Sequence, residues 1–421
     1  MKKLVKNSII LASCGIITKL IGAIYRVPLT AIIGAEGIGI YQMVFPIYCI
    51  LLTLSSTGIP NGIAKLTASG ERKVLRKSLL VFGSIGFLGS LTMFILSGYL
   101  AKLQGNALAE MAYKCLSPSI FLVSIISCFR GYYQGKLNML PTGLSQVIEQ
   151  IIKLAFGLTL CGFLGKTAAQ KASLATLAVT ISEIVALAFL LLLKRDKADR
   201  NLQEESYLRL IKTIFPIMLC SIMLPLTKSV DSFLVVNLLQ DDFTVATAKF
   251  GLYSGVVESI TALPVAVCYS VAVSGLPIIA KGDKGNAKKV LLYTAVMSVV
   301  FAIFVYFAAG LAINILYPKL TAEFKLLSTN LLKISSLSVI FLSLVQAFSA
   351  VMIGLNKLYV PSFALFFGLI TKTIFTLVLV PNVKIGVYGS AISDIFCYFV
   401  ATIVFLLYYI VYTNRQKYGH R

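Results

Sequence analysis

Charged side chains within long apolar segments are the residues of this chain best suited to chemistry. In the first such segment, Gly15, Lys19, Gly22 and Arg26 follow one another at spacings of four, three and four residues, so a helix would place them on one face. A Lys or Arg at the centre of a membrane helix costs about 2.5–3.5 kcal/mol on insertion scales, and such residues usually face a partner or a cavity. Two interpretations are open. Lys19 snorkels or pairs with a carboxylate while the glycines only pack, or the stripe lines a cavity in which Arg26 binds an anion.

Acidic residues in later apolar segments are candidates for binding a coupling cation. Lys228 and Asp231 stand three residues apart, and Glu149 and Lys153 stand four apart, spacings that allow an ion pair on one helical face. The Lys228–Asp231 couple could instead act as a proton- or cation-coupled switch. Glu258 has no partner nearby in the sequence and is the first candidate for a proton site.

Three more charged residues occupy positions that recur in the two halves of the chain. Lys372 corresponds to Lys153 but has no acid beside it, so a distant carboxylate, an anionic ligand or water must solvate it. Glu183 and Asp394 each follow a serine and precede an isoleucine. They are either structural features at the N-termini of their helices or sites of ion coupling.

Helices must position these residues, because the composition fits a membrane interior. Hydrophobic residues make up 58% of the chain, charged residues 13%, and the mean hydropathy is +0.90, whereas soluble domains carry about 25% charged residues. Apolar stretches long enough to cross a hydrocarbon core of about 30 Å recur about twelve times, without the alternation of barrel strands. We predict an all-α polytopic membrane protein with spans near residues 7–30, 38–64, 78–100, 113–133, 141–164, 172–193, 210–238, 250–279, 289–315, 326–353, 359–380 and 387–412.

The sequence also contains a weak internal repeat. GAEGIGIY at 34–41, closed by GIP at 58–60, is answered about 212 residues later by KFGLY at 249–253 and GLP at 275–277. FRGYYQG at 129–135 is answered by FSAVMIG at 348–354. Two copies of one helical bundle are typical of transporters, in which the bundles move against each other.

The repeat predicts two pseudo-symmetric lobes of six helices each. The N-terminal lobe would span residues 1–193, a polar linker residues 194–209, and the C-terminal lobe with a short basic tail residues 210–421. Prolines within helices free backbone carbonyls and permit bending. The candidate hinge or packing residues are Gly15, Gly22, Pro60, Pro216, Pro225 and Pro277.

Lys and Arg residues are biased toward alternate loops. With the N-terminus inside, the cytoplasmic loops and ends would carry 24 of them and the opposite loops 8, as the positive-inside rule expects. The formal net charge of +22 therefore reflects topology, and we expect no nucleic-acid partner. Lys19 interrupts the first apolar run, so we interpret this run as the first span rather than a signal peptide. Both termini are predicted to be cytoplasmic.

Residues for enzymatic or metal chemistry are scarce. The only histidine is His420, and the eight cysteines form no CxxC pair, so the sequence indicates neither a histidine-based metal site nor a disulfide framework. The glycines at 37 and 39 are not followed by Gly-Lys-Ser/Thr, so they do not form a phosphate-binding loop. We expect no enzymatic activity, no metal and no cofactor.

Three segments carry a resemblance to a known family. YRVPL at 25–29, GAEGIGIYQM at 34–43 and LLTLSSTGIPNGIAK at 51–65 resemble the stage V sporulation protein B group. This group belongs to the polysaccharide-biosynthesis flippases of the multidrug/oligosaccharidyl-lipid/polysaccharide exporter superfamily, which also contains the MATE transporters and lipid II flippases. The segment at 129–141 looks like the family's connection between the fourth and fifth helices.

The resemblance implies a MATE-like, V-shaped pair of six-helix lobes around a central cavity in a bacterial plasma membrane. It implies export of a polyprenyl-pyrophosphate-linked saccharide, a peptidoglycan or polysaccharide precursor, by alternating access. Many relatives of the sporulation and lipid II type have fourteen spans, and their last two helices help to form a groove for the lipid tail. The twelve spans predicted here leave the route of the polyprenyl chain open.

An anionic cargo would need basic residues to replace the water around its pyrophosphate. The candidates for this headgroup site are Arg26, Lys19, Lys65, Lys153, Lys228 and Lys372, and those for coupling to H⁺ or Na⁺ are Glu258, Asp231, Glu149, Glu183 and Asp394. The alternative is a proton- or sodium-coupled MATE-type multidrug antiporter, which would need acids in its cavity. A membrane glycosyltransferase would need a larger outer loop than the spans leave, and a purely structural protein would not need this much buried charge.

Overall fold

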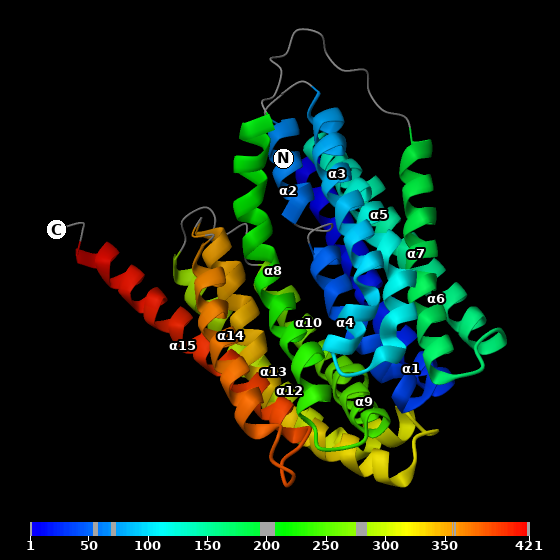
Figure 1. Ribbon diagram of the computed structural model, residues 1–421. Helices are drawn as coiled ribbons and strands as arrows, with labels where there is room; N and C mark the ends of the chain where they lie inside the picture. The colour runs from blue at the N-terminus through cyan, green and yellow to red at the C-terminus, as the bar shows by residue number, and fades with distance from the viewer. Residues whose placement is uncertain are drawn as a thin grey trace. The chain divides into compact units, whose positions relative to one another are not determined.

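Helices dominate the computed structural model, which describes residues 2–53, 58–68, 73–193, 207–274, 284–355, 357 and 359–418, and no strand occurs among these residues. Ten helices in this part of the chain are long and apolar enough to cross a membrane. The predicted all-α membrane architecture is therefore confirmed (Figure 1). One of the ten, Ser13–Ile50, contains a break at Gly34, which is where the sequence separates its first two predicted spans.

The described residues form a succession of helices and short helical turns. In chain order they are α1 (Lys2–Thr53), α2 (Ile59–Ala68), α3 (Val74–Ile95), α4 (Ser97–Leu103), the 3₁₀ turn η2 (Ala107–Ala109), α5 (Glu110–Gly135), α6 (Leu140–Phe163), α7 (Ala168–Leu192), α8 (Tyr207–Leu238), α9 (Phe243–Gly251), the π-helical segment η3 (Leu252–Val257), α10 (Glu258–Ser274), α12 (Lys284–Leu316), α13 (Ala322–Gly354), α14 (Tyr359–Leu379) and α15 (Tyr388–Tyr418).

The chain divides into two compact units, Met1–Pro225 and Leu226–Arg421. The division falls within α8, directly after Pro225. Most of the predicted linker at 194–209 lies outside the described residues, and the predicted lobe boundaries stay a prediction.

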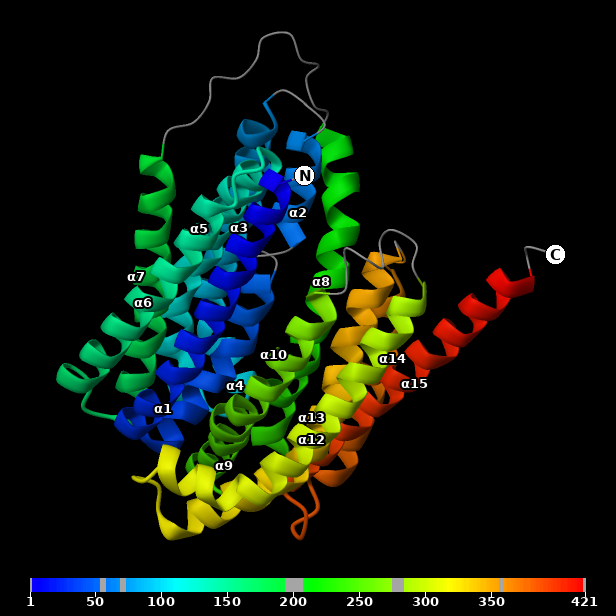
Figure 2. The same ribbon diagram turned by 180° about the vertical axis from the view of Figure 1, so that it is seen from behind.

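In the first unit, α5 packs against α2, α3 and α7, and α6 packs against α1 and α7 (Figure 2). Glycines on α5 permit its close approach to α2. A Cβ on Gly131 would lie 2.9 Å from the carbonyl oxygen of Pro60, and one on Gly135 would lie 2.8 Å from that of Ala64. Small residues spaced four apart allow two membrane helices to pack in this way.

The break in α1 depends on glycine. Gly34 has φ 74° and ψ −179°, a backbone region that is essentially open only to glycine. It ends the helix that carries the basic stripe and starts the helix that carries Tyr48.

In the second unit, α12 packs on α13, α14 on α15, and α13 on both α10 and α15 (Figure 1). Large apolar side chains on the outside of these helices stay uncovered, and Phe307 of α12 is 80% exposed. Lipid would cover such surfaces in a membrane, so burial of charge inside each unit is the more informative feature.

Candidate functional site

In each unit, buried acidic and basic side chains form a cluster together with a tyrosine. The first polar cluster consists of Tyr48, Arg130, Glu149, Lys153 and Glu183 from α1, α5, α6 and α7. The second polar cluster consists of Lys228, Asp231, Tyr253, Glu258, Lys372 and Asp394 from α8, η3, α10, α14 and α15.

An arginine and a glutamate form the centre of the first polar cluster. The Arg130 side chain is fully buried, and its Nη2 lies 2.9 Å from Glu149 Oε2. Its Nε donates to Ser145 Oγ at 3.0 Å, and Gln150 Nε2 lies 3.3 Å from Glu149 Oε1. A charge-assisted pair with further hydrogen bonds is the arrangement that makes buried charge tolerable.

This arrangement corrects two predictions. Glu149 does not pair with Lys153 four residues along α6, because the guanidinium of Arg130 from α5 reaches it instead. The count of cytoplasmic Lys and Arg residues above places Arg130 in a loop, but α5 continues to Gly135 and buries it. The sequence signal that could have identified Arg130 is its place within an aromatic and glycine-rich run, FRGYYQG, rather than within polar residues.

Glu183 lies in the middle of α7 and not at its N-terminus, where Thr167 is the cap. The prediction that it is a helix-start feature is therefore wrong. Glu183 is fully buried, and its Oε1 lies 3.1 Å from the hydroxyl of Tyr48. Lys153 is also buried, with its Nζ 5.8 Å from the ring centroid of Tyr25.

Two lysines and three acids form the ion pairs of the second polar cluster. Lys372 Nζ lies 2.7 Å from Asp231 Oδ2 and 2.5 Å from Asp394 Oδ1. Lys228 Nζ lies 2.5 Å from Glu258 Oε1 and 2.7 Å from Asp394 Oδ2. Asp394 thus bridges both ammonium groups.

These contacts correct the predicted pairing on α8. Lys228 does not pair with Asp231 on its own helix, since each finds a partner on another helix. Glu258 is not isolated, because Lys228 contacts it. Lys372 contacts the carboxylates of Asp231 and Asp394, which are distant in the sequence, and therefore needs no anionic ligand. These ion pairs join residues on different helices, so the spacing of residues along one helix does not predict them.

Tyr253 was not among the predicted residues, yet its hydroxyl donates to Asp394 Oδ2 at 2.6 Å. It lies in η3, a π-helical segment that leads directly into Glu258. Single π-helical turns inside α-helices are frequent at functional sites. The signal available in the sequence is that Tyr253 ends the second copy of the repeated motif, KFGLY.

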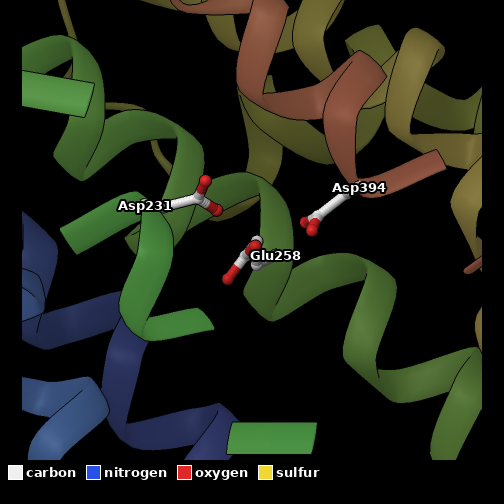
Figure 3. A group of neighbouring side chains, drawn as sticks. All are labelled: Asp231, Glu258 and Asp394. Carbon is white, nitrogen blue, oxygen red and sulfur yellow. The ribbon is translucent and has the colours of Figure 1, made fainter. Parts of the chain in front are cut away.

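Figure 3 shows the three acids of the second cluster, whose carboxylates point toward one another. One oxygen from each lies within 4.8 Å of the others, a spacing that could hold a metal ion. Lys228 and Lys372 already contact these carboxylates. The ammonium groups of these two lysines therefore already compensate part of the negative charge of the three acids.

The remaining predicted basic residues belong to the first unit. The Arg26 side chain is partly buried, with its guanidinium carbon 5.1 Å from the ring centroid of Phe45. Lys19 and Lys65 are exposed. Gly22 of the same stripe faces α6, since a Cβ on it would lie 3.5 Å from Gln150 Oε1.

The predicted hinge residues occupy several settings. Pro60 is buried in the first turn of α2, and Pro216 and Pro225 lie within α8. Nothing lies within 4 Å of a Cβ built on Gly15. Pro277 is outside the described residues.

Comparison with known proteins gives one family and several similar structures. The model of the family described as "Polysaccharide biosynthesis protein" matches residues 4–283. Stage V sporulation protein B of Bacillus subtilis (strain 168) is 23% identical over 428 residues, which cover 92% of this chain and 80% of that protein. An inward-facing multidrug resistance MATE transporter superposes with a TM-score of 0.79 at 16% identity, covering 95% of each chain. An inward closed structure of the lipid II flippase MurJ superposes with a TM-score of 0.78 at 14% identity, covering 95% of this chain and 87% of that one.

Proposed function

This chain belongs to the polysaccharide biosynthesis protein family, and from that membership we propose that it is a flippase for a polyprenyl-pyrophosphate-linked saccharide. The cargo would be a peptidoglycan or polysaccharide precursor carried to the outer leaflet by alternating access. The chain is a multi-pass membrane protein. Its Lys and Arg bias supports an orientation with both termini in the cytoplasm, and the match to a Bacillus subtilis protein supports a bacterial plasma membrane. We infer transport without covalent chemistry on the cargo.

The observation that carries this proposal is the contrast in charge between the two units. Within the spans of the second unit, the cluster lysines Lys228 and Lys372 are outnumbered by three acids that contact them. In the first unit, Arg130 pairs with the Glu149 carboxylate, and Lys153 forms no ion pair with a described residue. An anionic headgroup is therefore better matched to the first unit.

Within the first unit we propose that Arg26 binds the pyrophosphate. Its guanidinium can form forked, charge-assisted hydrogen bonds with phosphate oxygens. Lys19, Lys65 and Lys153 would add positive charge along the path. An inside-negative membrane potential would favour outward passage of the anion by about 2.3 kcal/mol per charge per 100 mV.

The test is flipping of a fluorescent polyprenyl-pyrophosphate saccharide in proteoliposomes that contain purified protein. Arg26→Ala should abolish flipping and leave thermal stability intact. Arg26→Lys should retain a fraction of the wild-type flipping rate, because lysine keeps the positive charge but lacks the two-pronged hydrogen bonding of the guanidinium. Arg76→Ala, at an exposed arginine of α3, is the matched control and should flip at the wild-type rate. Wild-type activity in Arg26→Ala would refute the assignment of this residue.

A second candidate, the cation-coupled multidrug antiporter, is favoured by one observation. The carboxylates of Asp231, Glu258 and Asp394 converge in the second unit, as an organic cation or coupling ion would require. Proton- or sodium-driven efflux of a cationic dye from the same vesicles would support it. Lys228 and Lys372 already contact those acids, which argues against a cation site there.

A further inference from the structure

The hydroxyl of Tyr48 lies between two carboxyl groups in the first polar cluster. Its oxygen is 3.3 Å from Glu149 Oε1 and 3.1 Å from Glu183 Oε1. A phenol has one hydrogen to donate, and an ionised carboxylate only accepts. If both glutamates were ionised, one of the two contacts would join oxygen lone pairs in a buried site with no hydrogen between them. A proton on one glutamate resolves this conflict.

The surroundings of the two glutamates indicate which one holds that proton. Glu149 has Arg130 at 2.9 Å and the amide of Gln150 at 3.3 Å, so its negative charge is compensated. Glu183 is fully buried, forms no ion pair among the described residues, and has an Oε2 without any hydrogen-bond partner. An ionised carboxylate in that setting is far costlier than a neutral carboxyl. The consistent arrangement is a neutral Glu183 that donates to Tyr48, which in turn donates to Glu149.

The groups that face Glu183 come from every helix packed against the middle of α7. They are Tyr48 from α1, Arg130 from α5, and Glu149 and Lys153 from α6. Arg130 is committed to Glu149. Lys153 forms no ion pair within the described part of the chain, so it is the cation that a charged Glu183 could recruit.

In the second copy of the internal repeat, the corresponding lysine and acid form an ion pair. Lys372 and Asp394 are the second-unit counterparts of Lys153 and Glu183. Their charged groups are 2.5 Å apart, and Asp394 also contacts Lys228. In the second unit the Asp394 carboxylate thus contacts two lysines, whereas in the first unit the corresponding Glu183 and Lys153 form no ion pair with each other.

We infer that Glu183 is a proton-carrying site, which binds a proton in one state of the transport cycle and releases it to water in another. On release, the negative charge left on Glu183 would be balanced by Lys153, as that of Asp394 is by Lys372. The coupling of this proton to transport rests on the proposed function, whereas the binding of a proton by Glu183 does not. It names the coupling ion as H⁺ and places the site in the first unit.

The direct test is infrared spectroscopy of the purified full-length protein in lipid nanodiscs. Wild type should show the carbonyl stretch of a buried protonated carboxyl near neutral pH and lose it as the pH rises. Glu183→Gln should remove the band, while Asp394→Asn should retain it. Lys153→Met should keep the band at pH values where the wild type has lost it, since the ionised form no longer has its partner. Absence of the band from wild type at every pH, or its persistence in Glu183→Gln, would overturn the inference.

Thermal unfolding gives an independent readout from the same pair of variants. Gln resembles a neutral Glu in shape and charge, so Glu183→Gln should keep the wild-type unfolding temperature. Asp394→Asn, at the repeat-related position, should lower it, because two lysines lose their shared carboxylate. A large loss of stability in Glu183→Gln would mean that the site requires a negative charge, and would contradict a bound proton.

Transport measurements separate this inference from the proposed function. If wild type flips the lipid-linked saccharide, Glu183→Gln should lose the response of flipping to an imposed pH gradient. An unchanged response would overturn the coupling role. If wild type flips no lipid-linked saccharide, the proposed function fails, and the infrared and unfolding results still decide whether Glu183 holds a proton.

Discussion

Replacing Lys372 with methionine should destabilise this protein more than the same change at the repeat-related Lys153. The Lys372 side chain is fully buried between Asp231 and Asp394. Asp394 would keep Lys228 as a partner, but Asp231, itself 2% exposed, has no other ion pair among the described residues. Removing one partner of a buried pair costs about 3–5 kcal/mol. At about 2–4 °C per kcal/mol for a unit of this size, the unfolding temperature should fall by roughly 6–20 °C.

The matched control is Lys153→Met at the repeat-related position of the first unit. Lys153 is buried but forms no ion pair with a described residue, and its Nζ lies 5.8 Å from the ring centroid of Tyr25. Its exchange for a side chain of similar volume should therefore cost less than about 1.5 kcal/mol. The double variant Lys372→Met/Asp231→Asn removes the orphaned charge and should recover most of the loss.

The assay is thermal unfolding of each purified variant in the same detergent, followed by the fluorescence of a thiol-reactive dye that detects the buried cysteines as they become exposed. Equal losses in Lys372→Met and Lys153→Met would refute the reasoning, because the two residues would then not differ in pairing. A double variant no more stable than Lys372→Met would show that Asp231 is not the orphaned group.

Three further changes test the packing and charge of the first unit by the same unfolding assay. Gly34→Ala should cost about 1–3 kcal/mol, because alanine cannot adopt φ 74° with ψ near 180° without strain; wild-type stability would mean that the break in α1 does not need glycine. Gly131→Val should cost about 1–3 kcal/mol by overpacking against the Pro60 carbonyl and α2, and a neutral effect would contradict the close contact of α2 with α5. Arg130→Met should cost about 3–5 kcal/mol, since it leaves Glu149 buried without its cation, and a loss under 1 kcal/mol would show that the pair is not buried in the membrane protein.

The membrane architecture could be predicted because it depends on hydropathy, which each segment expresses locally. The break at Gly34 and the helix at Tyr388–Tyr418 follow from glycine and from a long apolar run. The family resemblance of the segments within 25–65 was likewise confirmed by the family match, which covers residues 4–283. Such features require no knowledge of which helix lies beside which.

The pairing of charges could not be predicted, because it depends on contacts between helices. Spacing along one helix favoured Lys228 with Asp231, but the side chains reach Glu258, Asp394 and Lys372 on other helices. The repeat was the better guide, since it placed Asp394 and Lys372 among the candidates before any contact was known. Which acids would share a lysine depended on helix packing and rotation, which sequence periodicity does not specify.

The measurement that tests the central claim most directly is transport by the wild-type protein in proteoliposomes, with a membrane potential imposed and two cargoes offered in parallel. One is a fluorescent polyprenyl-pyrophosphate saccharide and the other a cationic dye. The account predicts that the lipid-linked saccharide crosses to the opposite leaflet, faster when the potential favours outward movement of its negative charge, and that the dye does not move. Cation-driven efflux of the dye, with no movement of the lipid-linked saccharide under any potential, would contradict it.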